Sequence, residues 1–256
     1  MLVSTCAHAQ EMGTNGPLSA AQVDSSVDEL GAKWIRTSDD TEWGFHSTEA
    51  AFAADVATAG TSGLWPALAT FHSRAMYAHS RGVRVLVPAM AAAAWARGSD
   101  RVGGNHWHQA ILPSKRWAFA EFARQLCLNG ADAIELTNEP NLAGEYAFGP
   151  DHPRVSYPDE RVDDYVLLLR AVYGRVKADP LTASCQVGIG GTSPVGHEMI
   201  VDVAGIHPVT WYQRLFNAKA DDRVTPSSAA GFFDFAAVHP YGEFGIPSGP
   251  ADWSYR

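Results

Sequence analysis

Short apolar runs of strand length alternate along this chain with longer segments whose apolar residues recur at helical spacing. Strands are predicted at 2–9, 32–37, 83–90, 132–137, 186–190 and 232–239. Amphipathic helices are predicted at 18–30, 70–80, 113–129, 163–177 and 209–218, and the first three are followed by Gly31, Gly82 and Gly130 as stop signals. Strict alternation of this kind predicts a parallel sheet with right-handed crossovers.

The predicted strands are apolar almost throughout, which is typical of strands covered on both faces. Six strand–helix units suit either a doubly wound sheet or most of a (β/α)8 TIM barrel, which typically takes about 250 residues and eight strands. The chain has 256 residues, and its sixth predicted strand ends close to the terminus. We therefore expect an α/β fold with a single barrel domain over 1–256, incomplete because strands seven and eight are missing.

Composition narrows the class of protein and of partner. At 46% hydrophobic and 18% charged, the chain can bury a full core. A net charge of −9 argues against a nucleic-acid partner, and no apolar run reaches the roughly 18 residues of a membrane span. Residues 1–10 lack the basic start and apolar length of a signal peptide, so localisation stays open, including secretion through a signal outside this chain.

The cysteine residues predict neither a disulfide nor a metal site. Cys6, Cys127 and Cys185 are odd in number and far apart, with no paired spacing. We expect neither a zinc site nor a disulfide, and interpret the three as small buried hydrophobic residues.

The strand predicted at 132–137 ends in Asn138, Glu139 and Pro140. Proline disfavours helix in the residue before it, so Glu139 is expected in extended backbone at a strand's carboxyl end, where parallel α/β proteins build their sites. A carboxylate beside an amide that can hold a hydroxyl suits protonation of a leaving sugar oxygen. The alternative is a strand-end glutamate that caps a helix or faces water.

Other predicted strands end in polar or aromatic residues too. Arg36 lies at the end of the strand at 32–37, His239 ends the sixth strand with Tyr241 after it, and Trp95 follows the third. Arginine can keep a carboxylate ionised, a tyrosine hydroxyl can donate to it, and indole rings stack on sugars. Taken alone, Arg36 could be an ordinary ion-pair partner and His239 a histidine in the core. Their common position at the carboxyl ends of strands favours a single site.

Several of these residues carry a resemblance to a known family. The motifs E-x-x-N-E-P-N at 135–141, W-I-R at 34–36 and V-H-P-Y at 238–241 resemble the clan of retaining glycoside hydrolases with (β/α)8 barrels, which includes cellulase-like and xylosidase-like families. The segment 211–241 resembles the fifth and sixth units of such barrels.

The resemblance implies that Glu139 is the general acid/base and that Asn138 binds the sugar 2-hydroxyl. It implies that Arg36, His239 and Tyr241 position the nucleophile and the substrate, and that Trp95 is the aromatic residue after the third strand. The family's nucleophile is a second glutamate after strand seven, and no such strand pattern follows Tyr241. We therefore expect a fragment with little activity alone.

The remaining motifs are weaker. Trp43 is a further candidate for substrate binding in the loop after the second strand. His106 and His108 are interpreted as substrate-loop residues, because no third metal ligand lies near them. The glycines at 188–191 resemble a dinucleotide loop, but the third glycine of that motif is missing.

The sequence therefore predicts a retaining glycoside hydrolase acting on an oligo- or polysaccharide, without cofactor or metal. Two alternatives stay open. One is a catalytically silent carbohydrate-binding barrel, and the other is a nucleotide-binding doubly wound domain.

Overall fold

The computed structural model describes residues 13–39, 41, 43, 46–59, 65–90, 93–99, 109–142, 146, 148, 151–153, 158–193, 206, 208–217 and 228–239. The elements are, in chain order, β1 (Gly13–Asn15), α1 (Ala20–Asp28), β2 (Trp34–Arg36), α2 (Glu49–Ala59), η2 (Pro66–Leu68), α3 (Ala69–Ser80), β3 (Arg84–Ala89), α4 (Ala94–Arg97), η4 (Pro113–Lys115), α5 (Arg116–Leu128), β4 (Ala133–Leu136), α6 (Pro158–Ala178), β5 (Gln186–Thr192), α7 (Pro208–Phe216) and β6 (Phe235–Val238).

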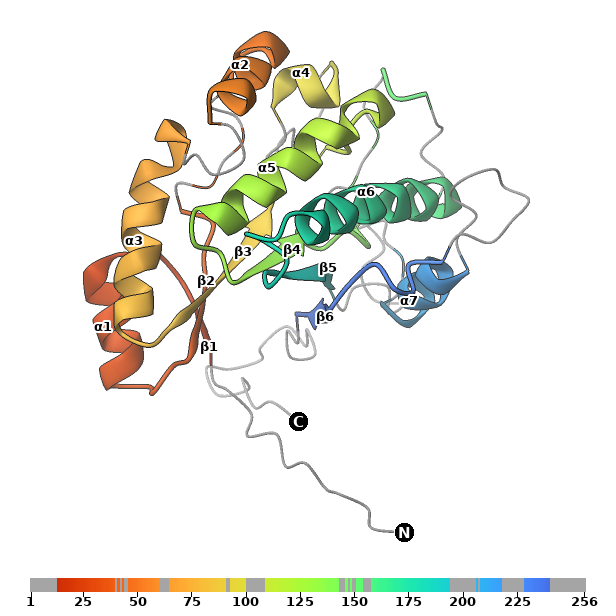
Figure 1. The fold of residues 1–256 in the computed structure, drawn as a ribbon. Coiled ribbons are helices and arrows are strands. Elements are labelled where there is room, and N and C mark those ends of the chain that lie inside the picture. Colours follow the sequence, from red (N-terminus) through yellow and green to blue (C-terminus); the bar gives the residue numbers. More distant parts are fainter. Residues whose placement is uncertain are drawn as a thin grey trace.

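The described strands form one sheet of six, ordered β1-β2-β3-β4-β5-β6, and every neighbouring pair is parallel. A doubly wound sheet reverses its strand order at a switch point, whereas a barrel keeps sequential order. Helices α3, α5 and α6 lie along the outer face of the curled sheet (Figure 1). The prediction of an incomplete (β/α) barrel is therefore confirmed for the fold, and the doubly wound alternative is wrong.

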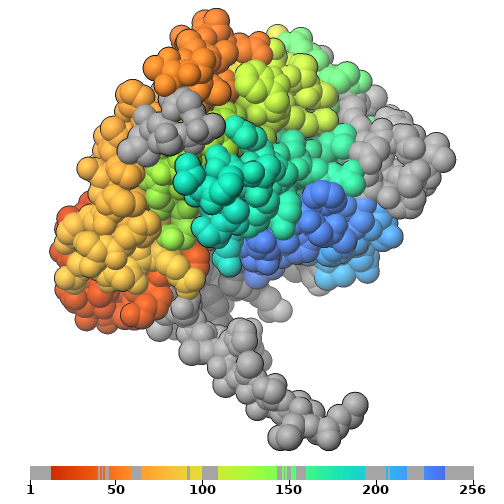
Figure 2. All heavy atoms as spheres, in the orientation of Figure 1, coloured from red at the N-terminus to blue at the C-terminus, as the bar shows by residue number. Residues whose placement is uncertain are grey.

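The core lies between the strands and this outer layer of helices. Val85 and Val87 of β3 and Ile134 and Leu136 of β4 have no exposed surface. On α6 five residues of the predicted apolar face, Tyr165, Leu168, Leu169, Val172 and Val176, are fully buried, and the sixth, Tyr173, is partly buried. Figure 2 shows the helices packed side by side, from the red and orange of α1 and α3 to the blue of α7.

The first strand differs from the prediction. The run at 2–9 lies outside the described residues, and the first described strand is β1. Its sequence, Gly-Thr-Asn, has no apolar pattern, and its residues are exposed or half-buried. An edge strand pairs on one side only, so backbone hydrogen bonding to β2 can hold it without apolar side chains.

Two helices were not predicted. The sequence of α2 is alanine-rich, which favours helix without producing a regular apolar stripe. Helix α4 has only four residues, too few for a periodic pattern. Among the described residues, no helix is both long enough and apolar enough to span a bilayer.

The cysteine prediction is wrong for two residues. Cys127 and Cys185 form a disulfide, with their Cα atoms 6.0 Å apart, although 58 positions separate them in the sequence. Cys127 lies in the last turn of α5 and Cys185 directly before β5, and both positions are at the amino-terminal edge of the sheet. Linear spacing cannot reveal this pair because the fold alone brings the two segments together; Cys6 lies outside the described residues.

Candidate active site

An ion pair between a half-buried arginine and a buried glutamate joins the ends of β2 and β4. The Glu135 side chain is 1% exposed, and its Oε2 accepts a 2.8 Å hydrogen bond from Nε of Arg36. Nη2 of Arg36 donates to Oε1 of Glu135 at 3.3 Å and to Oδ1 of Asn138 at 2.9 Å. Because β3 separates these strands, which are about 10 Å apart, the long arginine side chain must reach across the inner face of the sheet.

The neighbouring strand β5 adds a backbone donor to the same carboxylate. The Gly191 N–H donates to Oε1 of Glu135 at 2.6 Å. Burial acts to raise the pKa of Glu135, but the interaction with His239 and the hydrogen bonds from Arg36 and Gly191 outweigh it, so the pKa lies below its ordinary value. Glu135 is thus a buried, ionised carboxylate.

His239, directly after β6, lies between two carboxylates. Its Nδ1 is 3.0 Å from Oε1 of Glu139, and its Nε2 is 3.6 Å from Oε1 of Glu135. Interaction with Glu135 and then with Glu139 raises the pKa of His239 to about 9, against the opposing effect of burial. The imidazole is therefore protonated at neutral pH and donates to Glu139. The side chains of His239 and Glu139 are 14% and 13% exposed, so both reach the surface of the site.

The backbone at Glu139 contradicts the expectation of an extended conformation. Glu139 has φ +44° and Thr137 φ +60°, both in the left-handed region that non-glycine residues rarely adopt. Each such residue typically costs about 1–3 kcal/mol. Pro140 disfavours the right-handed helical region for Glu139, but it does not force the β region.

Hydrogen bonds hold this turn in place. The Glu139 N–H donates to the Gly191 carbonyl at 3.0 Å, and the Leu142 N–H donates to the Glu139 carbonyl at 2.9 Å. The buried Asn141 side chain donates to the Ser193 carbonyl at 2.8 Å and accepts from the Ser193 N–H at 2.9 Å. The turn after β4 is thereby fixed to the end of β5, in the conformation that directs Glu139 toward His239.

The glycines of β5 make room for this arrangement. A Cβ at Gly191 would lie 2.3 Å from Nε2 of His239, and one at Gly190 would lie 2.4 Å from the Leu136 carbonyl oxygen. A Cβ at Gly188 would lie 2.2 Å from the Phe235 ring. All three glycines are inside a strand. They permit close packing, so the resemblance to a dinucleotide loop is misleading.

The structure brings together four of the predicted site residues, Arg36, Asn138, Glu139 and His239. Tyr241, His106 and His108 lie outside the described residues. Glu135 and Gly191 also belong to this site, and the sequence predicts no role for either. Glu135 could have been found as the only charged residue in the apolar strand Ala133–Leu136, but nothing in the sequence marks Gly191.

The two predicted tryptophans lie in or against the core. Trp43 has no exposed surface, and its ring stacks on Phe122 at 5.7 Å between centroids. The prediction of Trp43 as a substrate-binding residue is therefore wrong, because the loop after β2 folds its side chain inward. Trp95 is half-buried, edge-on to Trp43 at 5.1 Å, and its Nε1 donates to the His46 carbonyl at 2.9 Å.

Within the described part of the chain, no group of three or more histidine, cysteine, aspartate or glutamate side chains could hold a metal ion. The site side chains at the carboxyl ends of β2, β4 and β6 can transfer protons and form hydrogen bonds.

No family model matches the sequence, and neither does any curated protein. Similar solved structures include a glycoside hydrolase family 30 endoxylanase from Clostridium papyrosolvens C71, at 14% identity and TM-score 0.43, covering 72% of this chain and 51% of that one. A family 30 subfamily 8 xylanase from Clostridium acetobutylicum has 17% identity and TM-score 0.41, covering 70% of this chain and 48% of that one.

A third similar structure is a glycoside hydrolase family 5 enzyme from Prevotella bryantii B14, in complex with a xyloglucan tetradecasaccharide. It has 13% identity and TM-score 0.46, covering 93% of this chain and 62% of that one. This chain spans about half the length of the family 30 structures. At these identities and TM-scores the likeness concerns the fold and carries no argument about residues or substrate.

Proposed function

We propose that this chain carries the acid/base part of a retaining glycoside hydrolase site, with Glu139 as the general acid/base and an oligo- or polysaccharide as substrate. The observation that supports this most is the contact of Glu139 with a protonated His239, itself next to the Glu135–Arg36 ion pair. Glu139 lies at the carboxyl end of a parallel strand, where barrel enzymes place their chemistry.

The first step requires the form of Glu139 that carries a proton, on Oε2, the oxygen that does not accept from His239. This form protonates the leaving glycosidic oxygen and becomes a carboxylate. The imidazolium of His239 donates to Oε1 at 3.0 Å, so it stabilises the negative charge that develops there. In the second step the same carboxylate removes a proton from water. His239 thus acts on Glu139 in both steps, as a positioning and charge-stabilising residue.

Asn138 and Arg36 have different proposed roles. Oδ1 of Asn138 accepts from Arg36, so the amide nitrogen is the part of the side chain that can donate to a substrate hydroxyl. Arg36 fixes Asn138 and Glu135 together, and Tyr241 is proposed to position the substrate. Trp95 remains a proposed stacking residue.

Glu135 is not proposed as the nucleophile. Its side chain is 1% exposed and both its oxygens accept hydrogen bonds from Arg36, so it cannot approach a sugar carbon. The retaining mechanism places a second carboxylate about 5–5.5 Å from the acid/base. We leave that residue unassigned.

The test is hydrolysis by Glu139→Gln in the full-length protein that carries the nucleophile, with Glu29→Gln at the end of helix α1 as the matched control. Loss of a positioned proton donor typically costs 10²–10⁴-fold, so glycosides with poor leaving groups should be cleaved at least 100-fold more slowly. Activated aryl glycosides should suffer less, and added azide should restore their turnover.

Two results count against the proposal. Unchanged hydrolysis of natural glycans by Glu139→Gln would show that another group supplies the proton. Oligosaccharide binding by calorimetry, without any turnover in the unmodified protein and unaffected by Glu139→Gln, would favour the alternative of a silent carbohydrate-binding barrel.

A further inference from the structure

Helix α6 carries a tyrosine whose hydroxyl reaches into the sheet beside the proposed site. Tyr165 has no exposed surface, and its hydroxyl donates to the Leu136 carbonyl at 2.8 Å. The same oxygen accepts a 2.9 Å hydrogen bond from the Gly190 N–H. Leu136 is the last residue of β4 and Gly190 lies in β5, so one phenol group bridges the two strands just before Glu139.

Neighbouring aromatic rings fix the direction of this side chain. The Tyr146 ring, from the segment between β4 and α6, lies edge-on to the Tyr165 ring with 5.4 Å between centroids. The Trp211 ring of α7 is also edge-on to it, at 5.4 Å. Burial raises the pKa of Tyr165 far above its ordinary value, so the hydroxyl keeps its proton at neutral pH. The position of this donor is therefore set by the packing of the rings around it.

The first partner of the hydroxyl lies at the start of the left-handed turn. Leu136 directly precedes Thr137, which has φ +60°, and Glu139 follows at φ +44°. Because the peptide group is planar, a hydrogen bond to the Leu136 carbonyl fixes the orientation of the whole peptide group between Leu136 and Thr137. The phenol group thereby fixes the direction in which the chain leaves β4.

The second partner lies next to the residue that holds the other end of the turn. Gly190 directly precedes Gly191, whose carbonyl accepts from the Glu139 N–H at 3.0 Å. The Gly191 N–H donates to Oε1 of Glu135 at 2.6 Å. Without the bridge, β5 is held less firmly against β4, and Glu139 moves relative to Glu135 and His239.

We propose that Tyr165 is a positioning residue for the general acid/base, and that it holds Glu139 at the distance from His239 that the proton transfers require. The inference rests on the proposed function, because it assigns the tyrosine to the same reaction. The tyrosine acts through the backbone of β4 and β5, since its hydroxyl binds Leu136 and Gly190. A tyrosine with a merely structural role would stabilise the sheet without affecting the contact between Glu139 and His239.

The first measurement is the pKa of the His239 imidazole, by NMR titration of the protein and of Tyr165→Phe, which keeps the ring and removes the hydroxyl. The pKa is about 9 in the unmodified protein, where the imidazole faces Glu135, Glu139 and Arg36. An opposite charge within about 4–6 Å shifts a pKa by about 1–3 units, so displacement of Glu139 should lower the pKa of His239 by about 1 unit.

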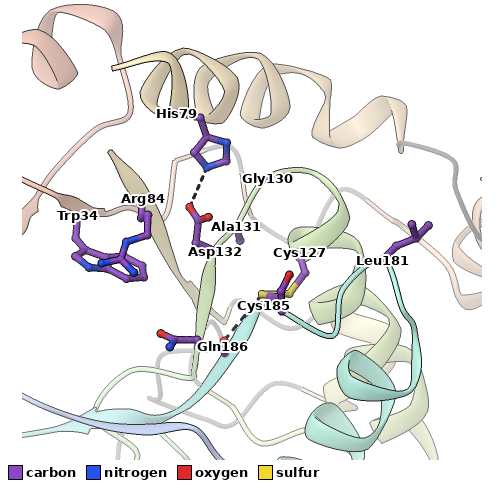
Figure 3. A pocket seen from close by; sticks show the side chains of 11 residues that line it. Trp34, His79, Arg84, Cys127, Gly130, Ala131, Asp132, Leu181, Cys185 and Gln186 are labelled. Carbon is purple, nitrogen blue, oxygen red and sulfur yellow. Dashed lines mark hydrogen bonds and ion pairs between the residues drawn. A yellow bond between two sulfur atoms is a disulfide. The ribbon is translucent and has the colours of Figure 1, made fainter. Parts of the chain in front are cut away.

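Two controls separate this effect from a general loosening of the protein. Tyr173→Phe makes the same change further along α6, at a ring that contacts Phe232 before the start of β6, and it should leave the pKa of His239 unchanged. His79 is an internal reference, because its hydrogen bond to Asp132 raises its pKa in a groove at the opposite, amino-terminal edge of the sheet (Figure 3). Its titration should be the same in all three proteins.

Hydrolysis by the full-length protein that carries the nucleophile gives the second measurement. A misplacement of about 1 Å can cost about 10²-fold in rate. Tyr165→Phe should therefore lower kcat for glycosides with poor leaving groups by about 10–100-fold with KM little changed, and activated aryl glycosides should be affected less. Tyr173→Phe should leave both constants unchanged.

Circular dichroism checks that each variant is folded. An unchanged pKa of His239 in folded Tyr165→Phe would overturn the proposal, even if the variant were less stable. Should the variant not fold, the unmodified protein still provides a test: the Tyr165 hydroxyl proton should exchange slowly and show a nuclear Overhauser effect to the Gly190 N–H, and its absence would overturn the proposal. The titration needs no turnover, so this failure is distinguishable from failure of the proposed function, which Glu139→Gln tests.

Discussion

The protonated imidazole of His239 makes stability depend on pH in a range where few side chains titrate. Its pKa is about 9 in the folded protein and about 6.5 in an unfolded chain. A raised folded pKa means that the contribution is fully present below pH 6.5 and is lost as pH rises through 9. The difference of about 2.5 pKa units, at 1.36 kcal/mol each, corresponds to about 3 kcal/mol of unfolding free energy.

The assay is urea unfolding of the protein and of His239→Asn between pH 6 and pH 10. Because other groups also titrate, His79 among them with its raised pKa, the informative quantity is the difference between the two proteins at each pH. We expect this difference to shrink by about 3 kcal/mol across the range, at constant m-value. A difference independent of pH would refute the placement of His239 between Glu135 and Glu139, as would an imidazole that titrates near pH 6.5 by NMR.

Three further outcomes are expected. Gly191→Ala should lower the free energy of unfolding by about 1–3 kcal/mol in urea, because the added Cβ would overlap the imidazole of His239. Gly174→Ala, in α6 with open space around it, should instead raise it, and equal effects of the two changes would contradict the packing described for β5. Reducing the disulfide should lower the free energy of unfolding by up to about 4 kcal/mol, the loop-closure value for a separation of 58 residues. Thermal unfolding with and without reductant measures this loss, and an unchanged midpoint temperature would argue against the bond. Glu135→Gln should cost at most about 3–5 kcal/mol of unfolding free energy, because the half-buried Arg36 and His239 lose their counter-charge; a loss below 1 kcal/mol in urea unfolding would mean that Glu135 is not the centre of the network.

The sequence predicts the strands of the sheet well because the apolar pattern of each strand lies within a few neighbouring residues. Runs such as 83–90 and 132–137 are apolar in the way that strands covered on both faces require, and the structure places β3 and β4 within them. Ser19 likewise caps α1 where a helix start was expected, and its hydroxyl accepts from the Gln22 N–H.

The features that the sequence does not predict depend on contacts between distant segments. The left-handed backbone of Glu139 is held by hydrogen bonds to β5 and to Leu142, and no local rule assigns it. Trp43 was expected at the cleft, but it is in the core because Phe52, Phe119 and Phe122 surround its ring. Glu135 is the first residue of the motif at 135–141, but its role depends on the ion pair with Arg36, 99 positions earlier in the sequence.

That long-range pair has an evolutionary consequence. Arg36 on β2, Glu135 on β4 and His239 after β6 are joined by direct contacts, so a change at one position leaves a buried charge uncompensated at another. Among homologous sequences, replacement of the glutamate should accompany replacement of the arginine, and a lineage with only one of them should be rare. The three positions should therefore covary as one unit, although they lie on strands that are not neighbours in the sheet.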